Sequence, residues 1–279
     1  MIRTIEAARV TEVVAQLCVQ VNTQVGGDIY TALQQARTCE TQPLAVNALD
    51  VLLQNADIAR REHLPICQDT GMTVVFVRMG EQVHAPGLTE AIHEGVRRGY
   101  RAGYCRNSVV RDPIDRINTG DNTPAVIHLE LVPGDALHIT VAPKGFGSEN
   151  MSGLRMLNPS DGLDGVKAFV LKTAKAAGPN ACPPMIIGVG VGGTMEKCAL
   201  LAKQALLRDV GSVHANPAWA QIERDLLEEI NALGIGPAAF GGKTTALAVH
   251  VETFPTHIAG LPVAVNIGCH ATRHCSAVV

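Results

Sequence analysis

The sequence predicts an α/β or α+β protein in which mixed β-sheets are surrounded by helices. Stretches with apolar residues three and four positions apart alternate along the chain with short runs rich in β-branched residues. No internal repeat and no low-complexity linker interrupts this succession. The chain has 279 residues, of which 47% are hydrophobic. That is enough to bury a core, and we expect a single domain over residues 1–279.

The helix predictions rest on the 3.6-residue apolar period and on signals at helix ends. Ser160-Asp161 can cap a helix that follows it, and Asn216 before Pro217 combines a cap with the residue favoured at the first helical position. The predicted helices cover residues 3–25, 44–63, 88–103, 162–177, 195–208 and 217–233.

The strand predictions rest on short apolar or alternating runs bounded by turn residues. "MTVVFVRM" is short and β-branched, and two later runs are separated by a turn at Pro133-Gly134. One sequence does not decide whether parallel pairing dominates the sheets. The predicted strands lie within residues 72–79, 123–132, 136–143, 183–193, 245–254 and 261–268.

Composition and charge exclude several classes of protein. The formal net charge is −3 and basic residues are scattered, so we expect neither a nucleic-acid partner nor binding to an anionic membrane. The first residues carry Glu6 and Glu12 and lack the unbroken apolar stretch of a signal peptide. No run approaches the ~18 apolar residues that a membrane-spanning helix requires. We therefore expect a cytoplasmic protein.

The eight cysteines need an explanation other than disulfides, which are rare in the cytoplasm. They form no C-x-x-C pair, so zinc ribbons and ferredoxin-type clusters match poorly. Cys67, Cys182 and Cys269 lie at expected element boundaries beside proline, glycine and polar residues. Three thiolates on a [4Fe–4S] cluster would leave one iron open to a substrate. The other five have helical or loop-like surroundings, for which a structural role is expected: Cys18, Cys39, Cys105, Cys198 and Cys275.

Two other functions are open from the residues alone. "GVGVGG" at 188–193 fits the G-x-G-x-x-G pattern, with Asp209 near the offset of a ribose-binding acid, as in an NAD-dependent dehydrogenase. The motif lies late in the chain and no clear second strand follows, so an anion-binding glycine turn is the preferred interpretation. A zinc-stabilised binding module is the other alternative, built from "GCHATRHC" with Cys269, His270, His274 and Cys275.

Three further segments could meet a small anion. The turn at 142–150 could aim backbone N–H groups and Lys144 at a carboxylate, or could simply connect a strand to a helix. Lys243 and Thr244 follow a glycine-rich stretch in which Pro237 replaces the glycine of a phosphate loop, so a solvated turn is an equal alternative. Arginine forks suit carboxylates, although we expect two of these three to be solvated or paired: Arg106, Arg111 and Arg116.

Several motifs together resemble one family. "CQDTG", "KGFGSEN", "NACPPMIIGVGVGGT" and "FGGKTTALAVHVETFPTHIAGLPVAVNIGCHA" occur in the order found in class I fumarate hydratases. Over essentially its whole length the chain resembles the α subunit of the two-subunit enzymes, and the α subunit of L-tartrate dehydratase shares the cysteine plan. The resemblance implies a fold like the N-terminal domain of class I fumarases. Phe146 departs from the family's commoner all-glycine turn.

The resemblance also implies an activity, a cofactor and a partner. The activity is the reversible hydration of fumarate to (S)-malate, with L-tartrate dehydration or mesaconate hydration as the nearest alternatives. Cys67, Cys182 and Cys269 would bind a [4Fe–4S] cluster, and Asp69 is the candidate proton donor. The chain ends at Val279, ten residues after Cys269, and would need a separate β subunit, as in an α2β2 heterotetramer. The substrate would contact Gln68, Asp69, Arg106, Gly147 and His257.

Overall fold

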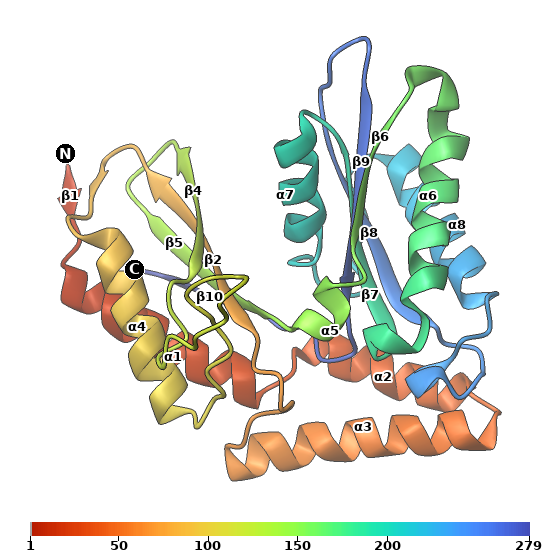
Figure 1. Cartoon of the computed structure of the whole chain (residues 1–279), viewed down its shortest axis with the longest axis horizontal. Helices are drawn as coiled ribbons and strands as arrows, with labels where there is room; N and C mark the ends of the chain where they lie inside the picture. Colours follow the sequence, from red (N-terminus) through yellow and green to blue (C-terminus); the bar gives the residue numbers. More distant parts are fainter. Residues whose placement is uncertain (1) are drawn as a thin grey trace. The chain divides into compact units, whose positions relative to one another are not determined.

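The computed structural model describes residues 2–279 and divides the chain into two compact units. Unit 1 comprises the residues up to 26 together with 55–146 and 273–279. Unit 2 comprises residues 27–54 and 147–272. Each unit has its own four-stranded sheet and its own helices (Figure 1).

The sheet of unit 1 has the order β10-β5-β2-β4. The central strand β2 (Met72–Gly80) pairs in parallel with β4 (Val126–Val132) and antiparallel with β5 (Leu137–Lys144). The short strand β10 (Cys275–Val278) pairs antiparallel with β5 and brings the C-terminal segment back to this sheet. A parallel neighbour on one side and an antiparallel neighbour on the other make the sheet mixed.

Two helices, α1 (Ala7–Thr23) and α4 (Leu88–Ala102), pack together and complete the core of unit 1. Gly95 and Gly99 of α4 face α1, where an added Cβ atom would lie 2.6 Å from side-chain atoms of Val14 or Cys18. The two glycines therefore allow the helix backbones to approach more closely than larger residues would permit. Burial of apolar side chains between these helices and the sheet supplies the main stabilisation.

The sheet of unit 2 has the order β6-β9-β7-β8. Strand β7 (Met185–Gly192) is buried along its whole length and pairs in parallel with β8 (Ala246–Phe254). On its other side β7 pairs antiparallel with β9 (Leu261–Gly268), which in turn pairs antiparallel with β6 (Gly153–Leu157). This sheet is mixed as well.

Helices cover both faces of the sheet of unit 2 (Figure 1). The apolar residues of β7 at 187, 189 and 191 belong to a core shared with α6 (Gly162–Ala177) and α8 (Pro217–Asn231). The opposite face carries α7 (Met195–Ala205). The remaining helices of this part are α2 (Gly27–Cys39), the short α5 (Phe146–Glu149), and α3 (Pro43–Glu62), within which the chain passes to unit 1.

The predicted fold class is confirmed, because both four-stranded sheets are mixed and helices pack against them. All six predicted helices and all six predicted strands are present. The first helix begins only at Ala7, since β1 (Arg3–Thr4) instead pairs with β3 (Val83–His84). Among the helices of residues 2–279, none combines the length and the apolar composition needed to cross a membrane.

Several elements were not predicted, and two cysteine surroundings were predicted wrongly. Cys39 is the last residue of helix α2 and Cys275 is the first residue of strand β10, so neither lies in a loop. Helix α2 has only three buried apolar residues, and β10 only four residues in all, so neither gives a strong periodic signal. The strands β1, β3 and β6 and the one-turn helix α5 were also missed, because each has only two to five residues.

The dinucleotide interpretation of the glycine motif is wrong about its local structure. Gly188 and Gly190 lie inside β7, where an added Cβ atom would be 2.1 Å from the carbonyl oxygens of Ala202 and Cys198 respectively. A dinucleotide fingerprint needs its first glycine in the turn after the strand. These glycines instead allow α7 to pack directly on the sheet.

Candidate functional site

The eight cysteines range from fully buried to exposed. All eight are free thiols. Burial raises the pKa of Cys105 to about 11 and that of Cys198 to about 12, and it raises the pKa values of Cys18 and Cys275 as well. Burial therefore disfavours the thiolate, the form that binds a metal, at these four positions.

None of the three cysteines predicted as ligands is fully buried, although Cys105 and Cys275 are half-buried as well. Cys182 is exposed, and Cys67 and Cys269 are half-buried. Cys39 is also exposed, but it lies at the end of α2 and not at a boundary between a strand and a glycine or proline turn. Three reachable thiols at loop positions fit the donor set of an iron–sulfur cluster.

In unit 1, Cys67 lies in a turn at residues 66–71 whose backbone is held at several points. Asn55 donates from Nδ2 to the carbonyl oxygen of Ile66 at 2.8 Å. The Tyr100 hydroxyl donates to the carbonyl oxygen of Thr70 at 2.8 Å. Gly71 has φ +77° and lies so close to Lys144 that an added Cβ would be 2.7 Å from its backbone. The glycine that ends "CQDTG" is therefore required by both conformation and space.

The carboxylate of Asp69 accepts two backbone hydrogen bonds. The N–H of Gly71 donates to Oδ1 at 3.0 Å, and the N–H of Phe146 donates to Oδ2 at 2.8 Å. A Cβ atom at position 145 would lie 3.1 Å from Oδ2, so Gly145 leaves room for this approach. The exposed side chain of Phe146 does not prevent the contact, because its backbone makes it.

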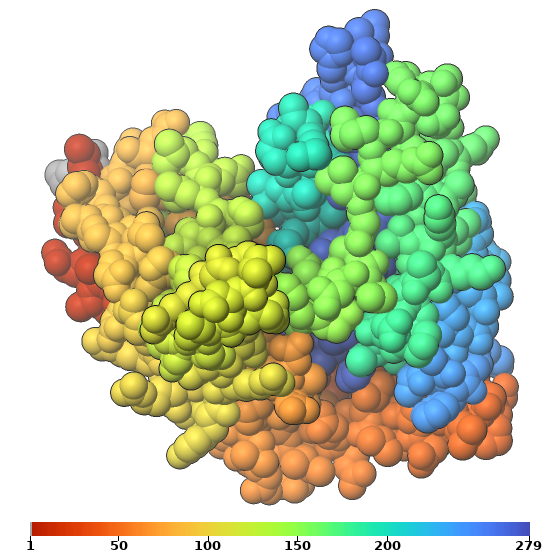
Figure 2. Space-filling view, viewed as in Figure 1, coloured from red at the N-terminus to blue at the C-terminus, as the bar shows by residue number. Residues whose placement is uncertain are grey.

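Arg106 is hydrogen-bonded to this turn, which also contains Gln68. The Thr70 hydroxyl donates to the carbonyl oxygen of Arg106 at 3.0 Å, which ties the start of the 106–120 segment to the turn. The side chains of Arg106 and Gln68 are both exposed. Figure 2 shows the segment that follows, in yellow, on the surface of unit 1. Unit 1 thus brings together Cys67, Gln68, Asp69 and Arg106.

The other two arginines of this segment do not join that group through any contact in unit 1. Arg111 is exposed, and its backbone N–H donates to the carbonyl oxygen of Ile117 at 2.8 Å. Arg116 is exposed and donates to the carbonyl oxygen of Pro113 at 3.4 Å. Both match the expectation of solvated or locally paired side chains.

In unit 2, Cys182 and Cys269 lie at the same end of the sheet. His270, directly after Cys269, approaches the carbonyl oxygen of Cys182 with its backbone N at 3.3 Å and its Nδ1 at 3.0 Å. Cys182 has φ +52°, a left-handed conformation that is uncommon for residues other than glycine. Such conformations are concentrated at functional sites, because the surrounding structure must compensate for their cost.

Gly147 lies at this end of unit 2 too. A Cβ atom on it would be 3.6 Å from the carbonyl oxygen of Asn180, two residues before Cys182. The helix that contains Gly147 is anchored by Glu149, which accepts from Lys203 Nζ at 2.6 Å and from Asn266 Nδ2 at 2.7 Å. Unit 2 thus brings Gly147 together with Cys182 and Cys269.

The structure does not bring His257 to that group. His257 lies in the β8–β9 connection, where Thr256 donates to the carbonyl oxygen of Gly193 just after β7. Cys182 precedes β7 and Cys269 follows β9, at the opposite end of the sheet. Since β7 has eight residues, the two ends are roughly 23 Å apart at about 3.3 Å per residue.

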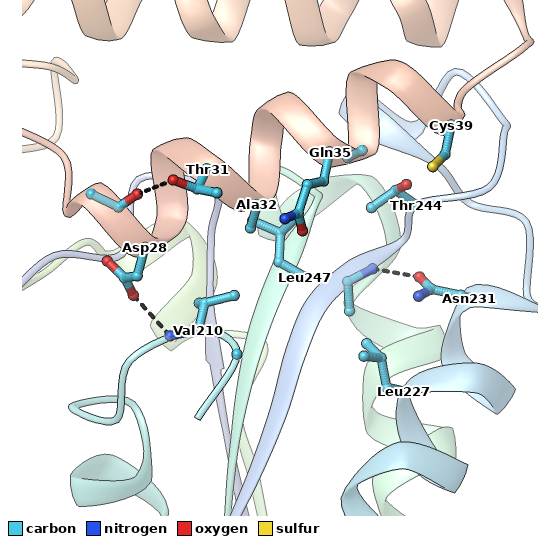
Figure 3. Close-up of a pocket in the computed structure, with 14 residues that line it drawn as sticks. Asp28, Thr31, Ala32, Gln35, Cys39, Val210, Leu227, Asn231, Thr244 and Leu247 are labelled. Carbon is cyan, nitrogen blue, oxygen red and sulfur yellow. Dashed lines mark hydrogen bonds between the residues drawn. The ribbon is translucent and has the colours of Figure 1, made fainter. Parts of the chain in front are cut away.

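A groove in unit 2 contains none of the proposed cluster-binding or substrate-binding residues, although Thr244 lines it. It has a volume of about 640 Å³ and is lined by α2, the start of β8 and part of α8 (Figure 3). Two of its polar side chains already serve the fold: Asp28 accepts from the N–H of Val210 at 2.8 Å, and Asn231 accepts from the N–H of Thr245 at 2.8 Å. We assign it no function.

The remaining candidates are built into the fold. Lys243 donates from Nζ to the carbonyl oxygen of Cys39 at 2.9 Å, and its backbone N–H donates to Glu40 at 2.7 Å, so it closes a loop. Lys144 is buried and donates to the carbonyl oxygen of Gly145 at 3.3 Å. Among residues 2–279, no three His, Cys, Asp or Glu side chains stand together as a ready metal-binding group, and this includes the C-terminal Cys and His residues.

Comparison with known proteins gives consistent matches over nearly the whole chain. The sequence model of the family described as fumarate hydratase (fumerase) matches residues 11–278. A Methanocaldococcus jannaschii protein named "Putative L(+)-tartrate dehydratase subunit alpha" is 39% identical over 273 residues, or 95% of each chain. The L(+)-tartrate dehydratase subunit alpha of Escherichia coli strain UTI89 is 33% identical over 95% of this chain and 89% of that protein. Its counterpart in strain K12 is 32% identical over the same shares.

These matches place the chain among hydro-lyases, enzymes that add or remove water at a carbon–carbon double bond. More particularly, the chain belongs to the fumarate hydratase (fumerase) family. This family of fumarases and tartrate dehydratase α subunits is of the iron–sulfur type.

Sequence reasoning missed the polar residues that hold the two groups in place. Asn266 interrupts the apolar strand "LPVAVNIG" and is buried, with Nδ2 donating to Glu149 and to Ser152. Asn22 falls on the apolar face of α1 and is fully buried. A polar residue in an otherwise apolar pattern is the signal that could have found both, because buried polar groups need partners. Arg273, which donates to Asn22 Oδ1 and to the carbonyl oxygen of Asp69, gives no such local signal.

Proposed function

We propose that this chain is the α subunit of an iron–sulfur-dependent hydro-lyase in which Cys67, Cys182 and Cys269 hold a [4Fe–4S] cluster. The observation that carries the proposal is the family match over residues 11–278 combined with the accessibility of these three thiols. The four cysteines with raised pKa values are poor alternatives as ligands. When bound through three cysteines, such a cluster supplies an open iron that acts as a Lewis acid toward hydroxyl and carboxylate oxygens.

The residues of the chain supply binding and a proton. In the dehydration direction a proton leaves the carbon beside a carboxylate, hydroxide leaves the neighbouring carbon, and a double bond forms between them. Asp69, entering the step as the protonated acid, is proposed to give hydroxide its proton, so that water departs and Asp69 is left as the carboxylate. Its two backbone hydrogen bonds fix the direction of the carboxylate. Gln68, Arg106 and the backbone at Gly147 are proposed to bind the substrate carboxylates.

His257 lies apart from the cysteines of unit 2. It was expected to contact the substrate, but within unit 2 it lies at the opposite end of the sheet from Cys182 and Cys269. A contact with a substrate held by the same chain's cysteines does not follow from that arrangement. A role for His257 would require that it reach the site of another chain.

Two substrates are proposed for the activity. The family description favours the hydration of fumarate to (S)-malate, whereas the names of the curated relatives favour the dehydration of L(+)-tartrate. Both substrates are four-carbon dicarboxylates that lose or gain water beside a carboxylate, so the same residues would serve either. Mesaconate hydration is a third possibility. The values of kcat/KM for fumarate, L(+)-tartrate and mesaconate, measured on one preparation, decide among them.

A partner and a location belong to the same proposal. The relatives are named as alpha subunits, and this supports a separate β subunit that supplies the base and the rest of the substrate pocket. We propose an α2β2 heterotetramer. A cytoplasmic location follows from the expected need to keep the cysteines reduced.

Anaerobic reconstitution with iron and sulfide tests the cluster. We expect about four irons per wild-type chain, the number in a [4Fe–4S] cluster, and loss of bound iron in Cys67→Ser, Cys182→Ser and Cys269→Ser. Cys39→Ser is the matched control, because it also removes an exposed thiol but should retain the iron. Full iron content in any of the three variants would remove that cysteine from the proposed site, and iron-free wild-type protein would overturn the proposal.

A further inference from the structure

A buried arginine lies behind the turn that carries Cys67. Arg273 is only 5% exposed. Its guanidinium donates from Nε and Nη2 to Asn22 Oδ1 at 3.3 and 3.1 Å, and from Nη2 to the carbonyl oxygen of Asp69 at 3.1 Å. A buried charge is costly unless it is well hydrogen-bonded, so the position implies that the charge or the fork of donors is needed there.

Asn22 connects this arginine to the other end of the turn. Asn22 is fully buried on α1, and its Nδ2 donates to the carbonyl oxygen of Cys18 at 2.9 Å, which fixes the side chain. Its own carbonyl oxygen accepts from the N–H of Ile66 at 2.9 Å. Asn22 and Arg273 thus form hydrogen bonds to the backbone at Ile66 and at Asp69, immediately before and two residues after Cys67.

The charge of Arg273 also acts inside unit 1. Burial raises the pKa values of Cys105 and Tyr100, and the positive charge of Arg273 opposes the rise at both. Tyr100 is the residue whose hydroxyl donates to the carbonyl oxygens of Thr70 and Gly71. The field of the guanidinium therefore favours negative charge in the same region where a thiolate and a dicarboxylate would be bound.

We propose that Arg273, acting with Asn22, is a positioning residue that fixes the 66–71 turn and places a buried positive charge behind it. The second part rests on the proposed function, because the charge matters only if an anionic cluster and substrate bind at this turn. The first part concerns the geometry of the turn and holds with or without a cluster.

Hydrogen exchange in the cluster-free full-length chain tests the first part. In Arg273→Gln we expect the amides of the 66–71 turn to exchange about tenfold faster, because one hydrogen bond to a charged group is worth roughly that factor. Amides of α6 in unit 2 should not change. Asn22→Ser, which keeps the arginine, should show the same local increase. Arg101→Gln, on the exposed part of α4, is the matched control and should leave the turn unchanged.

The reconstituted protein tests the second part. We expect the rate of iron loss to a chelator to rise about tenfold in Arg273→Gln, and by less in Arg273→Lys, which keeps the charge but loses the planar fork. Unchanged exchange in the turn, or equally faster exchange in α6, would overturn the positioning role. If wild-type protein takes up no iron while the turn of Arg273→Gln still loosens, the proposed function fails and the positioning role of Arg273 stands.

Discussion

Glu40 joins two segments that are distant in sequence. The carboxylate is only 6% exposed and accepts backbone hydrogen bonds from Thr41, Gln42 and Lys243 at 2.8, 3.0 and 2.7 Å. Gly242 lies so close that an added Cβ would be 2.5 Å from Oε2. Burial alone would raise the pKa of Glu40, but these hydrogen bonds outweigh burial and hold the pKa below its ordinary value.

We therefore predict that Glu40→Gln lowers the free energy of unfolding by about 1–3 kcal/mol at pH 7, the usual value for hydrogen bonds to a charged group. A lowered pKa means that the folded state favours the ionised form. The stabilisation is thus present above pH 4.5, the ordinary value, and is lost as the pH falls through the pKa of the folded state. Urea unfolding of wild type and variant at pH 7 and pH 4 measures how much of this stabilisation is lost. A gap between wild type and variant that is as large at pH 4 as at pH 7 would contradict it, and Glu62→Gln, on an exposed site, is the control.

The burial of His250 predicts a second effect of pH on stability, at higher pH than the effect of Glu40. The side chain is 2% exposed on β8, and burial, together with the charge of Arg208, lowers its pKa from 6.5 to about 4. Between these values the unfolded chain binds a proton that the folded chain does not, so stability falls as the pH falls. We expect a loss of about 1.5 kcal/mol between pH 6.5 and pH 5.

The variant His250→Gln should remove most of that loss, because glutamine does not titrate. Thermal unfolding at several pH values between 5 and 7 provides the measurement. His138→Gln is the matched control, since His138 is exposed on β5. An unchanged pH dependence in His250→Gln would show that another group is responsible.

Among the elements, the contact between α7 and β7 depends on the absence of side chains at two positions. Gly190 lies where a Cβ atom would be 2.1 Å from the carbonyl oxygen of Cys198, and backbone atoms cannot yield as a flexible side chain can. We predict that Gly190→Ala destabilises unit 2 by about 3 kcal/mol or more, at or above the upper end of the usual cost of overpacking. Denaturant unfolding measures the loss. Gly27→Ala should be nearly neutral, because no atom lies within 4 Å of its added Cβ; equal stability of the two variants would contradict the prediction.

The same glycines show what a sequence pattern can and cannot predict. The apolar run and the glycines of "MIIGVGVGG" correctly predict a strand followed by a helix. However, a dinucleotide-binding loop and a close strand–helix contact can have the same glycine pattern. Only the position of α7 distinguishes them. Long elements with a full apolar stripe were predicted to within a few residues, whereas α2 and β10 bury too little to show a period.

The order of the strands could not be predicted from the sequence, for a related reason. β4 and β5 are separated by a short turn, yet they lie on opposite sides of β2 and do not pair with each other. The C-terminal strand β10 pairs with β5 although more than 130 residues separate Cys275 from Val141. Pairing over such separations depends on the packing of the whole unit and leaves no mark in the local pattern.

At the scale of the whole molecule, the sequence suggested candidate ligands but not the contacts that hold their surroundings in place. Loop positions beside glycine and proline singled out Cys67, Cys182 and Cys269, of which Cys182 is exposed and the other two are half-buried. Their role as ligands stays a prediction. The contacts of Asp69 with Phe146 and of Arg273 with Asn22 join residues 77 and 251 positions apart. Such contacts are fixed by the three-dimensional fold, and a motif does not reveal them.

The last prediction concerns the assembled enzyme. If a β subunit supplies the base, the purified chain should take up the cluster on its own but turn over fumarate and L(+)-tartrate at least about 1,000-fold more slowly than the complex, since catalytic groups that act as a unit fail together. Mixing the loaded chain with its β subunit should restore turnover and give a complex whose mass, measured by light scattering, is that of α2β2. Cys269→Ser should still assemble but remain inactive, which separates assembly from chemistry. A lone chain that turns over either substrate as fast as the mixture would show that the catalytic base resides in this chain.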